Sequence, residues 1–365
     1  MTSDGAPMAQ TKRSRAVNAE DTDVTRVVQA VLAARARLLV AEGRTERRRS
    51  RRDARRAWFN RRIRRQWGRA LDSLEELIAV SAESGDLVAR EHCNASHLFA
   101  AQELLRQRAC QVAWEVHLLC ARGYADGAYA RWRTLHEIAV VIEFLHKFGE
   151  SAAERYLQHV HVKNRKVLRE YEECQRELRY PPLTGEEVGR SEAKKREVIA
   201  AYGDDFGNEY GWAATDCKVA NPTFFHVRQA AGYAFWKAHY GMASHAVHAG
   251  PHGILFRLGH PQGADAAPLS GPSLMGLCDP IDATAISVTH ATFAFFQSVR
   301  RLEQESLESN LEYTARIKYI STLGRRISEL ASRAQQRVEG RYGKKPKQPN
   351  ALHPTPAGVI MSRRG

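Results

Sequence analysis

The sequence predicts an all-α protein, a multi-helix bundle with disordered N- and C-terminal tails. Apolar residues recur at the three- and four-residue spacing of helices along most of the chain, and no sustained alternation of strand and helix patterns appears. Apolar residues also make up 43% of the 365 residues, enough for a sizeable core. We expect a disordered tail at 1–20, N-terminal helices with an Arg-rich segment at 21–90, a helical bundle domain at 91–338 and a disordered basic tail at 339–365.

Two helices are predicted in the N-terminal region. Asp21-Thr22-Asp23 can cap the first, which runs to about Glu42 and is followed by a glycine. The second runs from Thr45 to about Ser84, with an Arg-rich first half and an amphipathic second half. The apolar faces of the two helices contain Val24, Val27, Val28, Val31 and Leu32 in the first and Leu71, Leu74, Leu77 and Ile78 in the second.

Capping residues, glycines and prolines delimit the next elements. The expected helices are Ser96–Gly123, Asp126–Gly149 and Ser151–Tyr180, the last ended by a Pro-Pro pair. Thr184 begins a short charged helix, and residues 203–221 are expected to form a loop.

In the C-terminal third, capping residues, glycines and prolines again mark the helix boundaries, and glycine and proline are more frequent. Pro222 opens an apolar helical segment that ends near Ala249, and residues 250–281 are rich in glycine and proline, with one short strand expected at Ile254–Leu258. Asp282 caps a helix that runs to about Leu307, and a last amphipathic helix covers residues 311–338.

The positive charge is concentrated in one segment of the second helix. Residues 44–69 contain thirteen arginines and two acidic residues, in a chain of net charge +14. Arginines with interleaved aromatic residues can bind phosphates and stack on bases, so RNA or another polyanion is the partner this segment predicts. A solvated helix whose aromatic residues pack on the bundle is the alternative. The candidate nucleic-acid-binding residues are Arg48, Arg52, Arg55, Trp58, Arg62 and Arg65.

The helix expected at 126–147 carries polar residues beside its apolar stripe. Arg133 and Glu137 are four residues apart, and His136 lies between their directions on the helix. One interpretation is an anion or phosphate site lined by Arg131 or Arg133, with His136 as an acid–base group. The other is an intrahelical ion pair beside a solvated histidine.

A second polar stripe lies on a later helix. Tyr240, Ser244 and His248 follow at four-residue spacing in an aromatic and small-residue context. Their hydroxyls can bond to backbone carbonyls, or His248 can face the helix that carries Arg133 and Glu137. Because both helices are apolar, we expect Arg133 and Glu137 to form an ion pair and His248 to approach it.

No cofactor and no metal are expected. Histidines and glutamates are numerous, but no HExxH or paired ExxH motif is present. The six cysteines are scattered and form no framework, no secretory signal is visible, and the longest central apolar run is the pentapeptide IAVVI. We therefore expect a cytoplasmic protein without a membrane span. A homodimer is a further state that the sequence leaves open.

Four short segments together resemble a bacterial helical family of unknown function, DUF5677. They are RWRTLHEIAVVIEFL, AERYLQHV, YGWA and YGMASHAVH, and the resemblance covers about residues 95–300. It implies a helical fold and a bacterial source, and no settled activity.

Some such helical groups are compared with HEPN-type proteins, many of which are metal-independent ribonucleases of toxin and antiviral systems. Their signature is an arginine, a polar residue and a histidine four to six positions further on, and Arg131 to His136 satisfies this spacing, although Trp132 stands where a polar residue is usual. The resemblance implies catalysis by His136 and Arg131 or Arg133, with Glu137 and His248 as further candidates. The alternative is a non-catalytic helical binding or regulatory module.

Overall fold

The computed structural model describes residues 25–41, 46–91, 96–260, 269–302 and 307–342. Helices joined by turns and short loops make up all of these ranges, and they contain no strand, which confirms the all-α prediction. The predicted tail at 1–20 lies outside the described residues. Of the predicted tail at 339–365, the first four residues complete the last helix and the others lie outside the described residues.

The chain divides into two compact units, residues 1–61 and 62–365, and the division falls within the long helix α2 (Glu46–Glu91). The first unit contains a helix at 25–41 and the first part of α2. All side chains of the helix 25–41 are exposed, including those of the predicted apolar residues Val27, Val28, Val31 and Leu32; Val24 lies outside the described residues. The boundary predicted near residue 90 stays a prediction.

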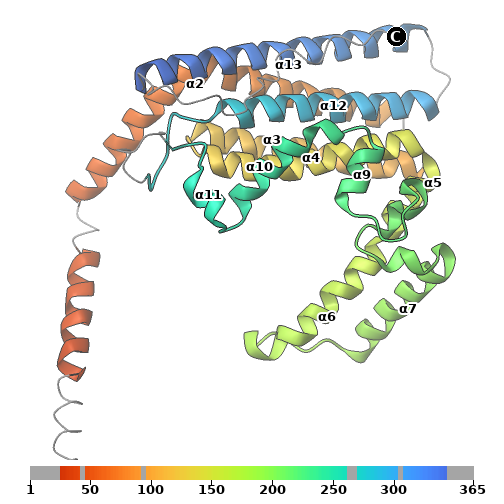
Figure 1. Cartoon of the computed structure of the whole chain (residues 1–365), viewed down its shortest axis with the longest axis horizontal. Helices are drawn as coiled ribbons and strands as arrows, with labels where there is room; N and C mark the ends of the chain where they lie inside the picture. Colours follow the sequence, from red (N-terminus) through yellow and green to blue (C-terminus); the bar gives the residue numbers. More distant parts are fainter. Residues whose placement is uncertain (1–24, 42–45, 92–95, 261–268, 303–306, 343–365) are drawn as a thin grey trace, which may run out of the picture. The chain divides into compact units, whose positions relative to one another are not determined.

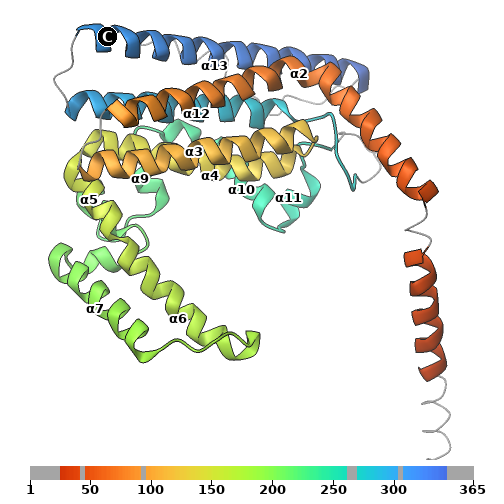
Figure 2. The same ribbon diagram turned by 180° about the vertical axis from the view of Figure 1, so that it is seen from behind.

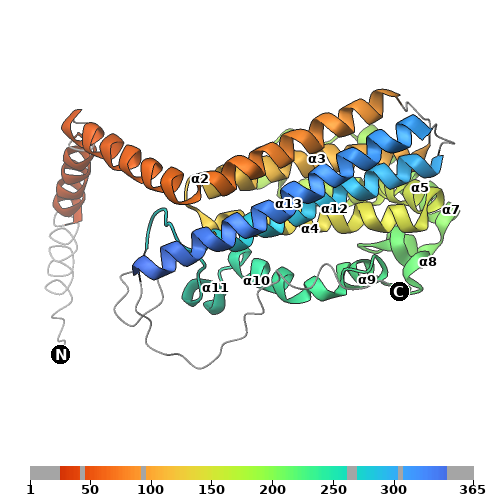
Figure 3. The ribbon, with the colours of Figure 1, turned by 90° about the horizontal axis from the view of Figure 1, so that it is seen from above.

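The second unit is a helical bundle. Helices α3 (His97–Ala121), α4 (Ala125–Phe148) and α12 (Cys278–Leu302) contact one another, and α13 (Leu307–Tyr342) packs on α12 (Figures 1 and 2). The part of α2 beyond residue 61 lies beside α13, and Gln66 donates a hydrogen bond of 2.8 Å to the carbonyl of Ala334 (Figure 3). The largest fully buried side chains include Trp67, Trp132, Phe144, Phe295 and Phe296.

Local signals determine the ends of the central helices. The Ser96 hydroxyl accepts a hydrogen bond of 3.0 Å from the Phe99 amide and caps α3, as predicted. Gly123 and Gly149 follow α3 and α4 with φ of 80° and 79°, where a side chain would be strained. The predicted helices 96–123 and 126–149 are confirmed.

Helix 151–180 was predicted as one element but is two, α5 (Glu150–Gln158) and α6 (Val160–Leu178). His159 interrupts it because its buried imidazole is held by the carbonyl of Asn208 at 3.0 Å and by the ring of Phe206. Gly149, not Ser151, occupies the N-cap position of α5. These partners lie far along the chain, so the local pattern does not reveal the break.

The segment between α6 and α12 consists of short elements. Thr184 and Glu187 form a capping box at the start of α7 (Gly185–Tyr202), which is longer than predicted. The predicted loop contains η1 (Asp204–Gly207), η2 (Gly211–Ala213) and α8 (Ala214–Cys217). The predicted helical segment 222–249 is divided into α9 (Phe224–Ala230), η3 (Ala234–Trp236) and α10 (Lys237–Val247), with Gly232 at φ 86° after α9.

Two further sequence predictions are wrong. The expected strand Ile254–Leu258 is instead the end of α11 (Pro251–Leu255) and the turn after it, because Pro251 occupies the first position of a helix. Asp282 does not cap α12, which begins at Cys278; its carboxylate accepts a hydrogen bond from the Ser328 hydroxyl of α13.

In the part of the chain that the structure describes, no helix is long and apolar enough to cross a bilayer. The described cysteines are free thiols: Cys110, Cys120, Cys174, Cys217 and Cys278.

Candidate functional site

The Arg-rich half of α2 presents its charges to the solvent. Arg48, Arg52, Arg55 and Arg65 are exposed and Arg62 is half-buried. Trp58 is 52% exposed on the same helix.

Other aromatic residues of the segment pack inward. Trp67 is fully buried, and its indole donates a hydrogen bond of 3.0 Å to the carbonyl of Leu274. Each of the two interpretations of this segment therefore fits part of it: Trp67 packs on the bundle, while Trp58 remains in contact with solvent beside the arginines.

The predicted ion pair on α4 is confirmed and has a third member. Arg133 Nε lies 3.2 Å from Glu137 Oε1. The Tyr240 hydroxyl of α10 accepts a hydrogen bond of 2.7 Å from Arg133 Nη2 and donates one of 2.6 Å to Glu137. Arg133 and Glu137 are 28% and 33% exposed, so this network lies at the edge of the core.

Arg131 does not join this network. Its guanidinium forms an ion pair with Glu115 of α3 and a hydrogen bond of 3.3 Å with the Thr134 hydroxyl. The two arginines flanking Trp132 therefore have different carboxylate partners, although they are two residues apart.

His136 is buried, with 1% exposure. Its ring lies 5.2–6.2 Å from the rings of five aromatic residues, which are Trp132, Phe224, Tyr233, Trp236 and Tyr240. Burial, followed by the charge of Arg228 and the neighbouring imidazoles of His239 and His290, lowers the pKa of His136 to about 3. The imidazole is therefore neutral at physiological pH, and the prediction of a solvated histidine is wrong.

His248 does not approach the network on α4. Helix α10 ends at Val247, and the backbone of His248 is extended (φ −101°, ψ 144°), which turns the exposed residue away from the stripe. Ser244 donates a hydrogen bond of 2.8 Å to the carbonyl of Tyr240, as one interpretation predicted. The stripe contributes only Tyr240.

Arg228 of α9 was not among the predicted residues. It is 4% exposed, and its guanidinium carbon lies 5.4 Å from the ring centre of Tyr240 and about 6 Å from those of Phe224 and Phe225. Burial lowers its pKa. Among the described residues it has no carboxylate partner and no side-chain hydrogen bond, and Nε is buried without one. The surrounding sequence, FFHVRQA, has no local feature that reveals this.

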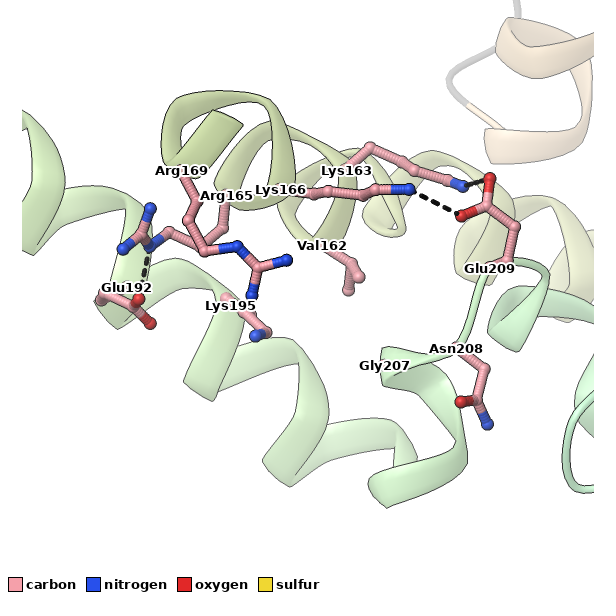
Figure 4. A pocket seen from close by; sticks show the side chains of 10 residues that line it. All are labelled: Val162, Lys163, Arg165, Lys166, Arg169, Glu192, Lys195, Gly207, Asn208 and Glu209. Carbon is pink, nitrogen blue, oxygen red and sulfur yellow. Dashed lines mark hydrogen bonds and ion pairs between the residues drawn. The ribbon is translucent and has the colours of Figure 1, made fainter. Parts of the chain in front are cut away.

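A basic cavity lies between α6, α7 and η1, also outside the predicted residues (Figure 4). Its volume is about 210 Å³. Lys163 and Lys166 reach Glu209 at one end, and Arg165 pairs with Glu192 at the other. The cationic residues that line it are Lys163, Arg165, Lys166, Arg169 and Lys195.

No group of three or more His, Cys, Asp or Glu side chains in the described ranges is arranged to hold a metal ion.

Residues 104–265 match the model of DUF5677, a family of unknown function. This confirms the family resemblance predicted from the four segments, within the broader range 95–300. No curated protein and no solved structure matches the chain. The HEPN-like resemblance stays a prediction.

Proposed function

Because the family matched by residues 104–265 carries no assigned function, we propose a role from the geometry of the chain itself: a nucleic-acid-associated helical protein of the bacterial cytoplasm. The binding surface is the Arg-rich half of α2, and the main form of the proposal is binding without catalysis. RNA is the expected partner, and a homodimer would present two such helices.

The observation that carries this proposal is the exposure of the arginines together with Trp58. Exposed guanidinium groups can contact successive phosphates, and each neutralised phosphate releases counterions. An indole with half of its surface in solvent can stack on an unpaired base, which favours single-stranded segments over a closed duplex.

The test compares two variants of equal charge. In the first, the five arginines of the proposed surface become glutamine: Arg48, Arg52, Arg55, Arg62 and Arg65. In the control, five exposed arginines elsewhere become glutamine: Arg176, Arg190, Arg196, Arg325 and Arg326.

Binding of single-stranded RNA is measured over a series of salt concentrations. The first variant should bind more weakly and lose up to roughly 0.7 of the logarithmic salt slope for each phosphate contact removed. The control should keep most of both. Equal losses in the two variants would show that only net charge matters, and the proposed surface would be refuted.

Catalysis remains the second candidate function, and it rests on the spacing from Arg131 to His136. In that case His136 would exchange a proton with the RNA 2′-hydroxyl, and a neighbouring arginine would stabilise the phosphorane. The burial of His136 among aromatic rings means that a phosphodiester could reach it only if the contacts of α4 with α9 and α10 opened. Binding without catalysis requires no such opening.

Cleavage in the presence of a chelator distinguishes these functions. A metal-independent ribonuclease of this type should give products with a 2′,3′-cyclic phosphate, and both His136→Ala and Arg131→Ala should reduce cleavage while RNA binding and helix content persist. His245→Ala, at an exposed position that is not among the catalytic candidates, is the matched control. Absence of cleavage, or cleavage unchanged in His136→Ala, leaves the binding function alone.

A further inference from the structure

Three buried nitrogen atoms without hydrogen-bond partners lie close together where α9, η3 and α10 meet α4. They are Arg228 Nε, His136 Nε2 and Trp236 Nε1; a fourth, Arg133 Nε, lies at the same junction and forms an ion pair with Glu137 instead of a hydrogen bond. The rings of His136 and Trp236 are 5.9 Å apart, and the rings of His136 and Tyr240 are 5.8 Å apart. Arg228 lies against the same Tyr240 ring. Buried polar groups are nearly always paired, so three such atoms in one place require an explanation.

The charges of this junction do not balance. Arg133 and Arg228 lie 4.8 and 5.4 Å from the centre of the Tyr240 ring. Two carboxylates of α4 lie near the junction: Glu137 is engaged by Arg133 and by the Tyr240 hydroxyl, and Glu143 acts on Tyr233, so neither is a partner of Arg228. Arg228 therefore keeps a buried positive charge that the aromatic rings stabilise only in part.

The residues around Arg228 also connect it with the surface. Phe225 is 45% exposed, and its ring is 5.9 Å from the guanidinium carbon. Arg133 and Glu137 are partly exposed on the other side of Tyr240. The guanidinium is therefore nearest to solvent on the side of Phe225, and a small group that binds it has to enter from that side.

We propose that Arg228 is the anchor of a binding site for a small-molecule oxyanion, a carboxylate or a phosphate, whose remaining body lies against the exposed ring of Phe225 and against Tyr240. The oxyanion accepts hydrogen bonds from the Arg228 guanidinium, and the Trp236 indole supplies a further donor. Arg133 adds positive charge from the opposite side of the site. This site is separate from the Arg-rich surface of α2 and does not depend on nucleic-acid binding.

The experiment titrates the full chain with sodium phosphate and, separately, with sodium acetate, at ionic strength held constant with sodium chloride. Trp236 lies within the site and is one of six tryptophans of the chain, so the total tryptophan fluorescence is one readout, and the midpoint of thermal unfolding is the other. Either anion should give a saturable change in fluorescence and a higher midpoint, and the anion that binds more tightly identifies the class of ligand.

Arg228→Gln should weaken that binding roughly tenfold to a hundredfold, because it removes charged hydrogen bonds. The control is Arg325→Gln, which removes one exposed arginine of α13 and should leave the titration unchanged. Circular dichroism checks that each variant keeps its helix content.

Arg228→Met is the second variant, since it keeps the length of the side chain and removes the charge. A ligand anchor should give a variant that unfolds at the same or a higher temperature without anion and no longer responds to it. The proposal is overturned if neither anion gives a saturable change, if Arg228→Gln responds as the unaltered chain does, or if Arg228→Met lowers the midpoint while the response persists.

Discussion

Arginines in two regions of this chain carry the same charge in opposite surroundings. Those of the first half of α2 are exposed, whereas Arg106 of α3 and Arg228 of α9 are 1% and 4% exposed. Arg106 is paired with Glu103 and Asp86, whereas Arg228 lies against aromatic rings and has no carboxylate partner among the described residues. The comparison shows that a segment dense in arginine lies at the surface. A single arginine within an apolar helix, in contrast, can lie in the core and position the groups around it.

The largest effect on stability is expected at Arg106. Its guanidinium donates hydrogen bonds of 2.6 Å to Asp86, 2.7 Å to Glu103 and 3.2 Å to the carbonyl of Ala82. Burial disfavours its charge, but the hydrogen bonds with Glu103 and Asp86 outweigh burial and raise its pKa. Arg106→Ala leaves Glu103 without its partner, so we expect a loss of about 3–5 kcal/mol in the free energy of unfolding, measured in urea.

Gly85 provides an independent check of the same site. A Cβ atom at this position would lie 2.4 Å from Arg106 Nη1, so Gly85→Ala should displace the guanidinium and lower stability even though alanine favours helices. A Gly85→Ala variant more stable than the unaltered chain would contradict this arrangement.

An intermediate effect is expected at Arg133, where burial is partial. Removing it takes one charged hydrogen bond from Tyr240 and one ion pair from Glu137, and both remaining groups keep some access to water. We expect Arg133→Ala to cost roughly 1.5–3 kcal/mol by thermal or urea unfolding. If Arg133→Ala cost as much as Arg106→Ala, arginines at the edge of the core and in its interior would contribute equally to stability, which would contradict this comparison.

His136 should make stability depend on pH. Its pKa is about 3 in the folded chain and about 6.5 when unfolded, so between these values the unfolded state binds the additional proton. Stability is therefore lost as pH falls from 6.5 toward 3, by at most about 1.4 kcal/mol per pH unit from this residue.

His136→Phe removes this titration while keeping an aromatic ring. Comparison of unfolding at pH 7 and pH 5 should show a smaller loss in the variant than in the unaltered chain. The other histidines with lowered pKa values, His117, His159 and His290, act in the same direction in both proteins and cancel in the difference. Identical pH dependence would mean that His136 is already accessible to protons in the folded state.

The smallest effect is expected at Arg64, at the junction between the two kinds of arginine. Its ion pair with Asp72 joins side chains that are 64% and 53% exposed. Arg64→Ala should change the free energy of unfolding by about 0–1 kcal/mol, and added salt should reduce even this difference. A loss above about 2 kcal/mol would show that the solvent exposure of an arginine does not predict its contribution to stability.

The sequence predicts the elements whose signals are local. Ser96, Gly123 and Gly149 determine helix ends through their own backbone and hydroxyl chemistry, and Arg133 meets Glu137 because residues four apart share a helix face. The break at His159 depends on Asn208, which is 49 positions away, and therefore has no local signal.

The candidate site shows the same limit. Tyr240 lies on the predicted stripe and reaches the predicted ion pair, but the stripe ends before His248 because α10 ends at Val247. Arg228 becomes a buried cation only because α9 packs on α4 and because the ring of Tyr240 covers it. The spacing of residues within α9 predicts neither of these contacts.

Helices α6 and α7 contact each other, yet α6 buries only Val162 and α7 only Val198. Such a pair can open by local unfolding at much lower cost than the α3–α4–α12 core, and its amide hydrogens should exchange with solvent sooner. The basic cavity draws its cations from both helices. An anion bound in the cavity would therefore slow hydrogen exchange in both helices, because anion binding would be coupled to the local folding of the pair.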